Sequence, residues 1–118
     1  MKATATILSL LGFSANAIAT CYGSGETWGN NAQALSAVSW ACHQLVGSYG
    51  GSETRGICVD ANSKRLEFQI WHITSGSREL GYDECYDGFQ KEVNGCTNGG
   101  DSSYVNWRYK GDPNAGSC

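Results

Sequence analysis

The chain of 118 residues lacks the patterns on which several common classes of enzyme and metalloprotein depend. There is no G-x-S-x-G motif, which argues against a serine hydrolase of the α/β type. There is no C-x-x-C pair and no cluster of Cys and His, so a zinc site is not expected. The basic residues are scattered, which argues against nucleic acid or an anionic membrane as a partner.

Acid–base catalysis finds little support in the sequence either. Of the two histidines, His43 ends a predicted helix, where the helix dipole favours a cation, and His72 lies at the end of a predicted core strand. A ribonuclease would need His72, Glu67 and Arg108 to meet, yet His72 and Glu67 point to opposite faces of one strand. The eleven acidic residues are dispersed, whereas a glycosidase needs two carboxylates across a cleft. We therefore predict a protein without catalysis and without a cofactor.

Residues 1–19 have the features of a secretory signal peptide. A basic start is followed by an apolar run from Ala3 to Phe13, and Ala17-Ile18-Ala19 forms a cleavage site, with Ala15-Asn16-Ala17 as an alternative. The run is too short to cross a bilayer, and no later stretch reaches the roughly 20 apolar residues that a membrane helix needs. We predict a secreted, extracellular protein whose mature domain comprises residues 20–118.

The predicted mature domain is acidic and rich in cysteine. Loss of Lys2 with the signal leaves seven Lys or Arg against eleven Asp or Glu, a formal charge of about −4. All six cysteines fall in this domain and imply three disulfides, each stabilising it by typically about 2–4 kcal/mol. No N-x-S/T acceptor occurs in it, so N-glycosylation is not expected.

Two helices are predicted. One runs from Tyr82 to Asn94, between Gly81 as N-cap with Glu84 as its capping-box partner and Gly95 as a left-handed stop. An apolar stripe at spacing four marks its buried side and consists of Cys85, Phe89 and Val93. The other helix is capped by Asn30 or Asn31 and stops at Gly47; its periodic apolar residues are Leu35, Val38, Ala41, Cys42 and Leu45.

Four strands complete the predicted fold. Alternating apolar and polar residues predict a hairpin, and the strands are Thr20–Tyr22, Thr54–Ala61, Lys64–Thr74 and Ser102–Lys110. A tail from Gly111 to Cys118 closes the chain with a turn at Asp112-Pro113-Asn114. The order β-α-β-β-α-β predicts an α+β two-layer sandwich, an antiparallel sheet with both helices on one face.

The up-and-down path of such a chain indicates how the cysteines pair. It favours Cys21 with Cys118, Cys42 with Cys85, and Cys58 with Cys96. A bridge from Cys85 to Cys96 is disfavoured, because a helix would separate their Cα atoms by about 16 Å where a disulfide needs about 5–6 Å. Strand parity places Cys58 away from the predicted core, which leaves a bulge there or a different pairing open.

The side of the sheet away from the helices is the predicted binding face. A sugar site pairs an exposed aromatic ring with hydrogen-bonding side chains, and parity places there Trp71, Gln69, Glu67, Tyr104, Asn106 and Arg108. Trp28 in a Gly-rich loop, and Asp112 and Asn114 in the closing turn, are further candidate contacts. Trp40 is expected in the core. The same face could instead be covered by a second copy of the chain in a homodimer.

Three stretches of the chain resemble a known family. CYDGFQKEVNGC, the following Gly99-Gly100, and WRYKGDPNAGSC are similar to the small secreted glycan-binding proteins of filamentous fungi, the family of the ink-cap mushroom lectin. The resemblance extends over the mature chain, from Cys21 to Cys118. It implies an α/β sandwich, dimerisation through sheet edges and recognition of GlcNAc-type glycans or glycoproteins, but it carries over no sugar-contacting position.

A second resemblance concerns only topology and cysteine density. Secreted fungal killer toxins and plant-directed effectors of the α/β-sandwich kind share both features, and they act on a protein, a channel or a cell wall. A secreted glycan-binding protein is therefore the first hypothesis, and a secreted effector or killer-toxin-like protein is the alternative.

Overall fold

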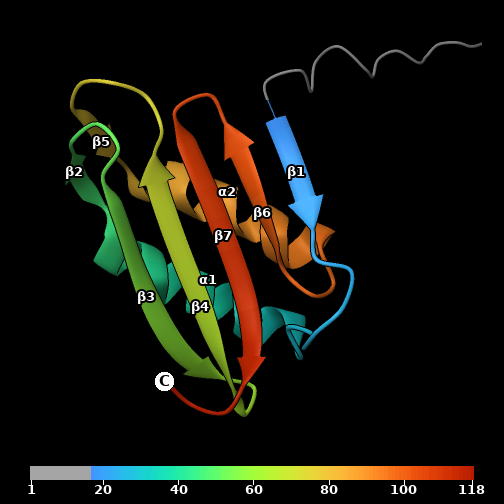
Figure 1. Ribbon diagram of the computed structural model, residues 1–118. Coiled ribbons are helices and arrows are strands. Elements are labelled where there is room, and N and C mark those ends of the chain that lie inside the picture. Colours follow the sequence, from blue (N-terminus) through green and yellow to red (C-terminus); the bar gives the residue numbers. More distant parts are fainter. Residues whose placement is uncertain (1–16) are drawn as a thin grey trace, which may run out of the picture.

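The computed structural model describes residues 17–118, so the part of the predicted signal peptide before residue 17 lies outside the described residues. In the described part, two helices pack on one face of a five-stranded antiparallel sheet, with three disulfides (Figure 1). The predicted α+β class is confirmed. The elements are β1 (Ala17–Cys21), α1 (Asn31–Leu45), β2 (Gly47–Tyr49), β3 (Thr54–Ala61), β4 (Lys64–His72), β5 (Arg78–Leu80), α2 (Tyr82–Gly95), β6 (Gly100–Tyr104) and β7 (Trp107–Ala115).

The sheet has the strand order β1-β6-β7-β4-β3, so β3 and β1 are its edges. The strands β2 and β5 form a separate two-stranded ribbon in segments that the sequence assigns to loops or loop ends. Figure 1 shows both helices behind the sheet, which leaves the other face open. Among residues 17–118, no helix combines the length and apolar character that crossing a membrane requires.

The hairpin of β3 and β4 agrees most closely with its prediction. Its turn residues Asn62 and Ser63 have φ values of 57° and 60°, the left-handed pair that a two-residue type I′ turn requires. Along β4, buried residues alternate with partly buried ones, and the buried set is Leu66, Phe68, Ile70 and His72. The predicted parity of this strand, including His72 at the end of the core, is confirmed.

The predicted strand Ser102–Lys110 is wrong in extent, because the chain reverses within it. β6 ends at Tyr104, Val105 and Asn106 form a turn, and β7 begins at Trp107. No Gly or Pro marks this turn, and Val105 adopts a φ of 41°, which is rare for a β-branched residue. Val105 is therefore 63% exposed rather than part of the core.

β7 also continues through the segment predicted as a closing turn. It pairs with β4 along its whole length, from Trp107 to Ala115. β6 pairs with it only as far as Gly111, so at Pro113 the strand has a neighbour on one side alone. A proline lacks the N–H that a second neighbour would need, and such a one-sided position accommodates it.

Helix α2 begins as predicted but differs at both caps. Gly81 is the N-cap without any side-chain hydrogen bond, so the predicted capping box with Glu84 does not form. Gly95 is the last helical residue rather than a left-handed stop, and the chain leaves the helix through an extended Cys96. The left-handed conformation comes later, at Gly99 with a φ of 84°, where a Cβ would overlap the backbone of Gly111.

The apolar stripe of α2 packs on the sheet as predicted. Its residues are at most 5% exposed: Cys85, Phe89 and Val93. The Phe89 ring meets Phe68 of β4 and Tyr109 of β7 edge-on, with centroid distances of 5.3 and 5.1 Å. This close approach depends on Gly88, because a Cβ there would overlap the Tyr109 ring.

Two tryptophans lie where the sequence did not place them. Trp28 is only 4% exposed, since its loop folds back over the core; its ring stacks on Phe68, and its indole N–H donates to the carbonyl of Cys96 at 2.8 Å. Trp28, predicted as a further ligand contact, is therefore buried in the core instead. Trp40 was expected in the core but projects from α1 and is 51% exposed.

The disulfides differ from the predicted pairing in two of three cases. Cys42–Cys85 joins the helices as predicted, with Cα atoms 5.7 Å apart. The other two bridges are Cys21–Cys96 and Cys58–Cys118, with Cα distances of 5.1 and 5.8 Å. The exchange follows from β7, which pairs with β4 as far as Ala115, so the short tail after it reaches Cys58 of β3. Cys58 faces that side, so the parity was right and no bulge is needed.

Candidate functional site

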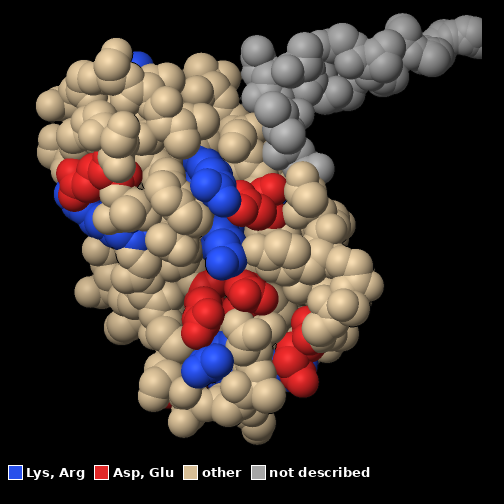
Figure 2. Space-filling model, viewed as in Figure 1, with Lys and Arg blue, Asp and Glu red and all other residues tan. Residues whose placement is uncertain are grey.

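The open face of the sheet is built by alternate residues of its two central strands. They project away from the helices and form cross-strand pairs: Arg65 with Asn114, Glu67 with Asp112, Gln69 with Lys110, and Trp71 with Arg108. Figure 2, which views this face, shows basic and acidic side chains following one another along β4 and β7. The strands therefore hold a row of hydrogen-bonding groups beside one tryptophan.

Trp71 lies at one end of this row, covered in part by a cation. The guanidinium carbon of Arg108 is 4.1 Å from the centroid of the Trp71 ring, a cation–π contact. Asp101 of β6 holds the same guanidinium through two hydrogen bonds, from Nε at 2.8 Å and from Nη2 at 2.6 Å. This bond to Asp101 raises the pKa of Arg108, so the group stays charged. Trp71 is partly buried, and its orientation is set by Arg108.

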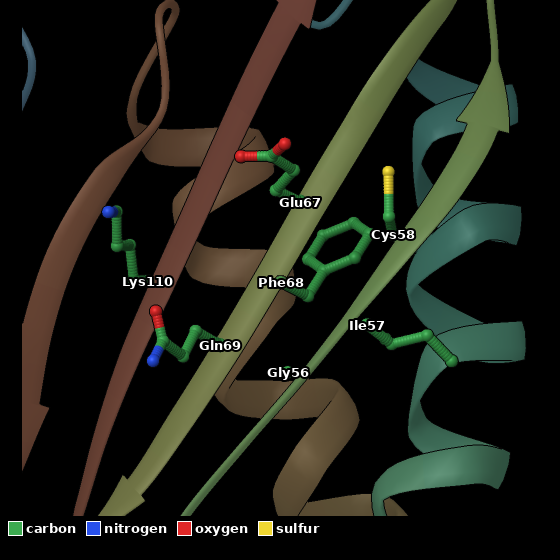
Figure 3. Close-up of a pocket in the computed structure, with 7 residues that line it drawn as sticks. All are labelled: Gly56, Ile57, Cys58, Glu67, Phe68, Gln69 and Lys110. Atoms are coloured by element: carbon green, nitrogen blue, oxygen red, sulfur yellow. The ribbon is translucent and has the colours of Figure 1, made fainter. Parts of the chain in front are cut away.

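A shallow hollow of about 290 Å³ lies on the open face between β3, β4 and β7, where Gly56 of β3 has no side chain (Figure 3). Gly56 pairs directly with Gln69, and Trp71 is the next residue on that face of β4, so Trp71 is a diagonal neighbour at roughly 7–8 Å. Gln69 and Lys110 project from adjacent strands next to the hollow, and the Gln69 amide is oriented by a 3.3 Å hydrogen bond to Thr54. Cys58, which is bonded to the C-terminal Cys118, borders the other side.

Charges around the hollow are only partly neutralised. Glu67 forms an ion pair with Arg65 at 3.3 Å and accepts a hydrogen bond from the amide of Asn114 at 3.3 Å. Asp112 stands directly opposite Glu67, and in residues 17–118 neither Asp112 nor Lys110 lies within ion-pair distance of an opposite charge. The face thus offers an ammonium group, carboxylates and amides to a ligand.

Six of the nine predicted contacts share this face: Trp71, Gln69, Glu67, Arg108, Asp112 and Asn114. The other three do not. Tyr104 lies on the helix side, where Lys91 approaches its ring at 4.5 Å, and Trp28 is in the core. Asn106 lies in the β6–β7 turn, and its side-chain oxygen accepts a hydrogen bond from Thr74 at 3.1 Å. The parity argument failed for Tyr104 and Asn106 because the chain reverses between Tyr104 and Trp107.

Three residues of the face were missed by the sequence argument. Lys110 has the same parity as Arg108 and ends the predicted strand Ser102–Lys110, so the same parity argument could have found it. Gly56 alternates with Ile57 on β3, so its missing side chain could have been recognised as a gap in the face. Asp101 could not be found without knowledge of the separate strand β6, which brings it next to Arg108.

The helix side of the sheet contains an acid of different character. Glu92 of α2 is 1% exposed, and this burial raises its pKa from 4.5 to about 7. The Ser102 hydroxyl lowers the pKa of Glu92, and the negative charge of Asp101 raises it, but both effects are smaller than that of burial. Glu92 lies on the opposite layer from Trp71, so it is not part of the open-face site. No group of three or more His, Cys, Asp or Glu among residues 17–118 is arranged to hold a metal ion.

Comparison with known proteins does not supply an identity. No protein-family model matches the chain, and no curated protein is significantly similar to it. The structure defines the chain as a small cysteine-rich α+β domain with three disulfides, which is consistent with an oxidising compartment. A function has to be argued from the open face itself.

Proposed function

We propose that this protein is a secreted fungal lectin-like protein that binds GlcNAc-type glycans without catalysis, using the open face of its sheet. The observation that carries the proposal is the hollow over Gly56, which is lined by Gln69 and Lys110, with Trp71 as the next residue after Gln69 on that face of β4. An apolar sugar face can pack against the exposed part of the indole while amide and ammonium groups bond its hydroxyl or acetamido groups. The resemblance to fungal glycan-binding proteins supports the same class.

The arrangement favours binding over hydrolysis. Glu67 and Asp112 are neighbours on one flat face, whereas glycosidases place their two carboxyl groups on either side of the scissile bond. Glu67 is also engaged by Arg65 and Asn114. Both residues are therefore suited to accept hydrogen bonds from sugar hydroxyls. The strands that carry them are rigid, and such preorganisation reduces the entropy lost on binding.

The test is a glycan array with the disulfide-bonded mature protein. We expect selective binding to glycans that contain GlcNAc, and a loss of about tenfold or more in affinity for Trp71→Ala, because truncation removes the ring contact and frees Arg108. Ile73→Ala is the matched control, since Ile73 is a 44% exposed apolar residue just beyond β4 that does not line the hollow. Unchanged binding by Trp71→Ala would show that the open face is not the glycan site.

The alternative, an effector or killer-toxin-like protein, is favoured by one observation. Arg108 is held between Trp71 and Asp101, and Trp and Arg are the residues most enriched at the energetic centres of protein–protein interfaces. A protein partner would then dock on the same face. If the protein binds no glycan on the array but is toxic to a target cell, and Trp71→Ala abolishes that toxicity, the alternative is supported and the lectin proposal is refuted.

A further inference from the structure

Trp40 is the one strongly exposed tryptophan in the described part of the chain, at 51%. It lies on α1, where it continues a helix face that also contains Ser36 one turn earlier and Gln33 two turns earlier. This face lies next to β3, one of the two edge strands of the sheet. Trp40 is not part of the core, so about half of its surface is available to contact a ligand.

A hollow of about 320 Å³ lies between this helix face and β3. Small apolar residues form part of its lining: Ala37, Val59 and Ala61. Trp40 also borders it, together with Gln33, Ser36 and Asp60. Its volume is at the lower end of the range for small-ligand sites, which suits one sugar ring better than a large ligand.

Two polar side chains at the hollow are free to bind a ligand. Within residues 17–118 the side chains of Gln33 and Ser36 form no hydrogen bond, and only the backbone N–H of Gln33 is engaged, by the Asn30 cap. Asp60 has the parity of Cys58 on β3, and its carboxylate accepts from the backbone N–H of Cys118 at 2.8 Å on the open-face side, so it is not one of the ligand groups of this hollow. The side chains of Gln33 and Ser36 place an amide and a hydroxyl beside an indole, which are donors and acceptors for a hydroxyl-rich ring.

We propose that this hollow is a second saccharide-binding site, in which a pyranose ring stacks on Trp40 and hydrogen-bonds to Gln33 and Ser36. The inference takes the ligand class from the proposed function, but it uses different residues on the other layer of the molecule. Trp71 lies on the open face of the sheet, whereas Trp40 lies on α1 at the edge next to β3. One chain would therefore bind two sugar residues, and linked sites raise avidity for a glycan-coated surface without any new contact at either site.

The experiment is a titration of the mature protein with N,N′,N″-triacetylchitotriose, followed through the indole N–H signals in ¹H–¹⁵N NMR spectra. Trp40→Phe and Trp71→Phe identify the two signals. We expect both to shift, each with its own dissociation constant. Trp40→Ala, followed through the side-chain amide signals of Gln33, should lower affinity at the α1–β3 site about tenfold and leave the Trp71 titration unchanged. Because Trp40 is exposed, this variant should fold, and the dispersion of the remaining signals checks that it does.

The outcomes separate the two proposals. A shift of Trp71 alone would overturn the second site and leave the lectin proposal intact, whereas a shift of Trp40 alone would support the second site and refute the open-face site. If neither signal moves, both are refuted. A Trp40 signal that changes with protein concentration in the absence of sugar, together with a doubled mass in sedimentation, would show that the hollow is an interface between two copies and would also overturn the second site.

Discussion

The buried acid Glu92 gives a quantitative prediction about stability and pH. Its carboxyl is 1% exposed, beneath the sheet, where Gly100 and Gly111 approach α2 so closely that a Cβ at either position would meet Glu92 atoms. Burial raises its pKa from 4.5 to about 7. One pH unit of pKa change corresponds to about 1.4 kcal/mol, so this group can change the free energy of unfolding by about 3 kcal/mol.

The direction of the effect follows from proton binding. Between pH 4.5 and about pH 7 the unfolded chain has lost the Glu92 proton while the folded chain keeps it. The folded state therefore binds more protons, and the free energy of unfolding falls as pH rises through this window. Below the window both states are protonated, and above it both are ionised, so the contribution is constant outside it.

The perturbation is Glu92→Gln, which keeps the shape and removes the ionisation. The assay is urea unfolding of both proteins with intact disulfides from pH 4 to pH 8. Other groups change stability with pH as well, including Glu53, whose pKa is lowered by hydrogen bonds from the Gly50 N–H and Arg55. Their effects cancel in the difference between variant and parent. We expect that difference to move in favour of Glu92→Gln by about 3 kcal/mol between pH 4 and pH 8.

A matched control is Glu79→Gln, which changes an exposed carboxyl on β5. It makes the same Glu→Gln change at a carboxyl that is exposed to water rather than buried, and so serves as the reference for the Glu92→Gln difference. The reasoning would be refuted if the Glu92→Gln difference stayed within about 0.5 kcal/mol over the whole range, since Glu92 would then ionise alike in both states.

Two further predictions concern the packing of α2. Gly88→Ala should lower the free energy of unfolding by about 2–3 kcal/mol, because the new methyl group overlaps the Tyr109 ring. Its control is Gly95→Ala, whose methyl group meets no atom within 4 Å and which should raise the free energy of unfolding by up to about 1 kcal/mol. Equal effects of the two changes in urea unfolding would contradict the described contact. Replacing Cys42 and Cys85 together by Ala should cost about 4 kcal/mol, given the 43-residue separation, and a loss below about 1 kcal/mol would show that the bridge constrains little.

Much of the fold could be predicted because it depends on local periodicity. The alternation in β3 and β4 and the Asn62-Ser63 turn are encoded within about twenty consecutive residues, so the hairpin and its two faces follow from the sequence. The stripe on α2 follows in the same way. These elements place Trp71, Gln69 and Glu67 on one face of β4, which is why the centre of the candidate site was found.

The errors arise where a distant segment changes the environment of a local pattern. The alternation around Val105 reads as one strand, and the reversal that moves Tyr104 to the helix side depends on β6 pairing with both β1 and β7. Trp28 is buried because its loop packs against Phe68, forty residues later. Neither contact leaves a signal within its own stretch of sequence.

The sequence alone therefore determined the α+β class, the number of disulfides, the β3–β4 hairpin and the parity of its residues, since each depends on spacing along the chain. Only the tertiary structure decided which cysteines pair and which tryptophans are exposed. It also decided that Arg108, hydrogen-bonded to Asp101, lies over the Trp71 ring. These features depend on distances between segments far apart in the chain, and those distances exist only once strand order and the path of β7 are known.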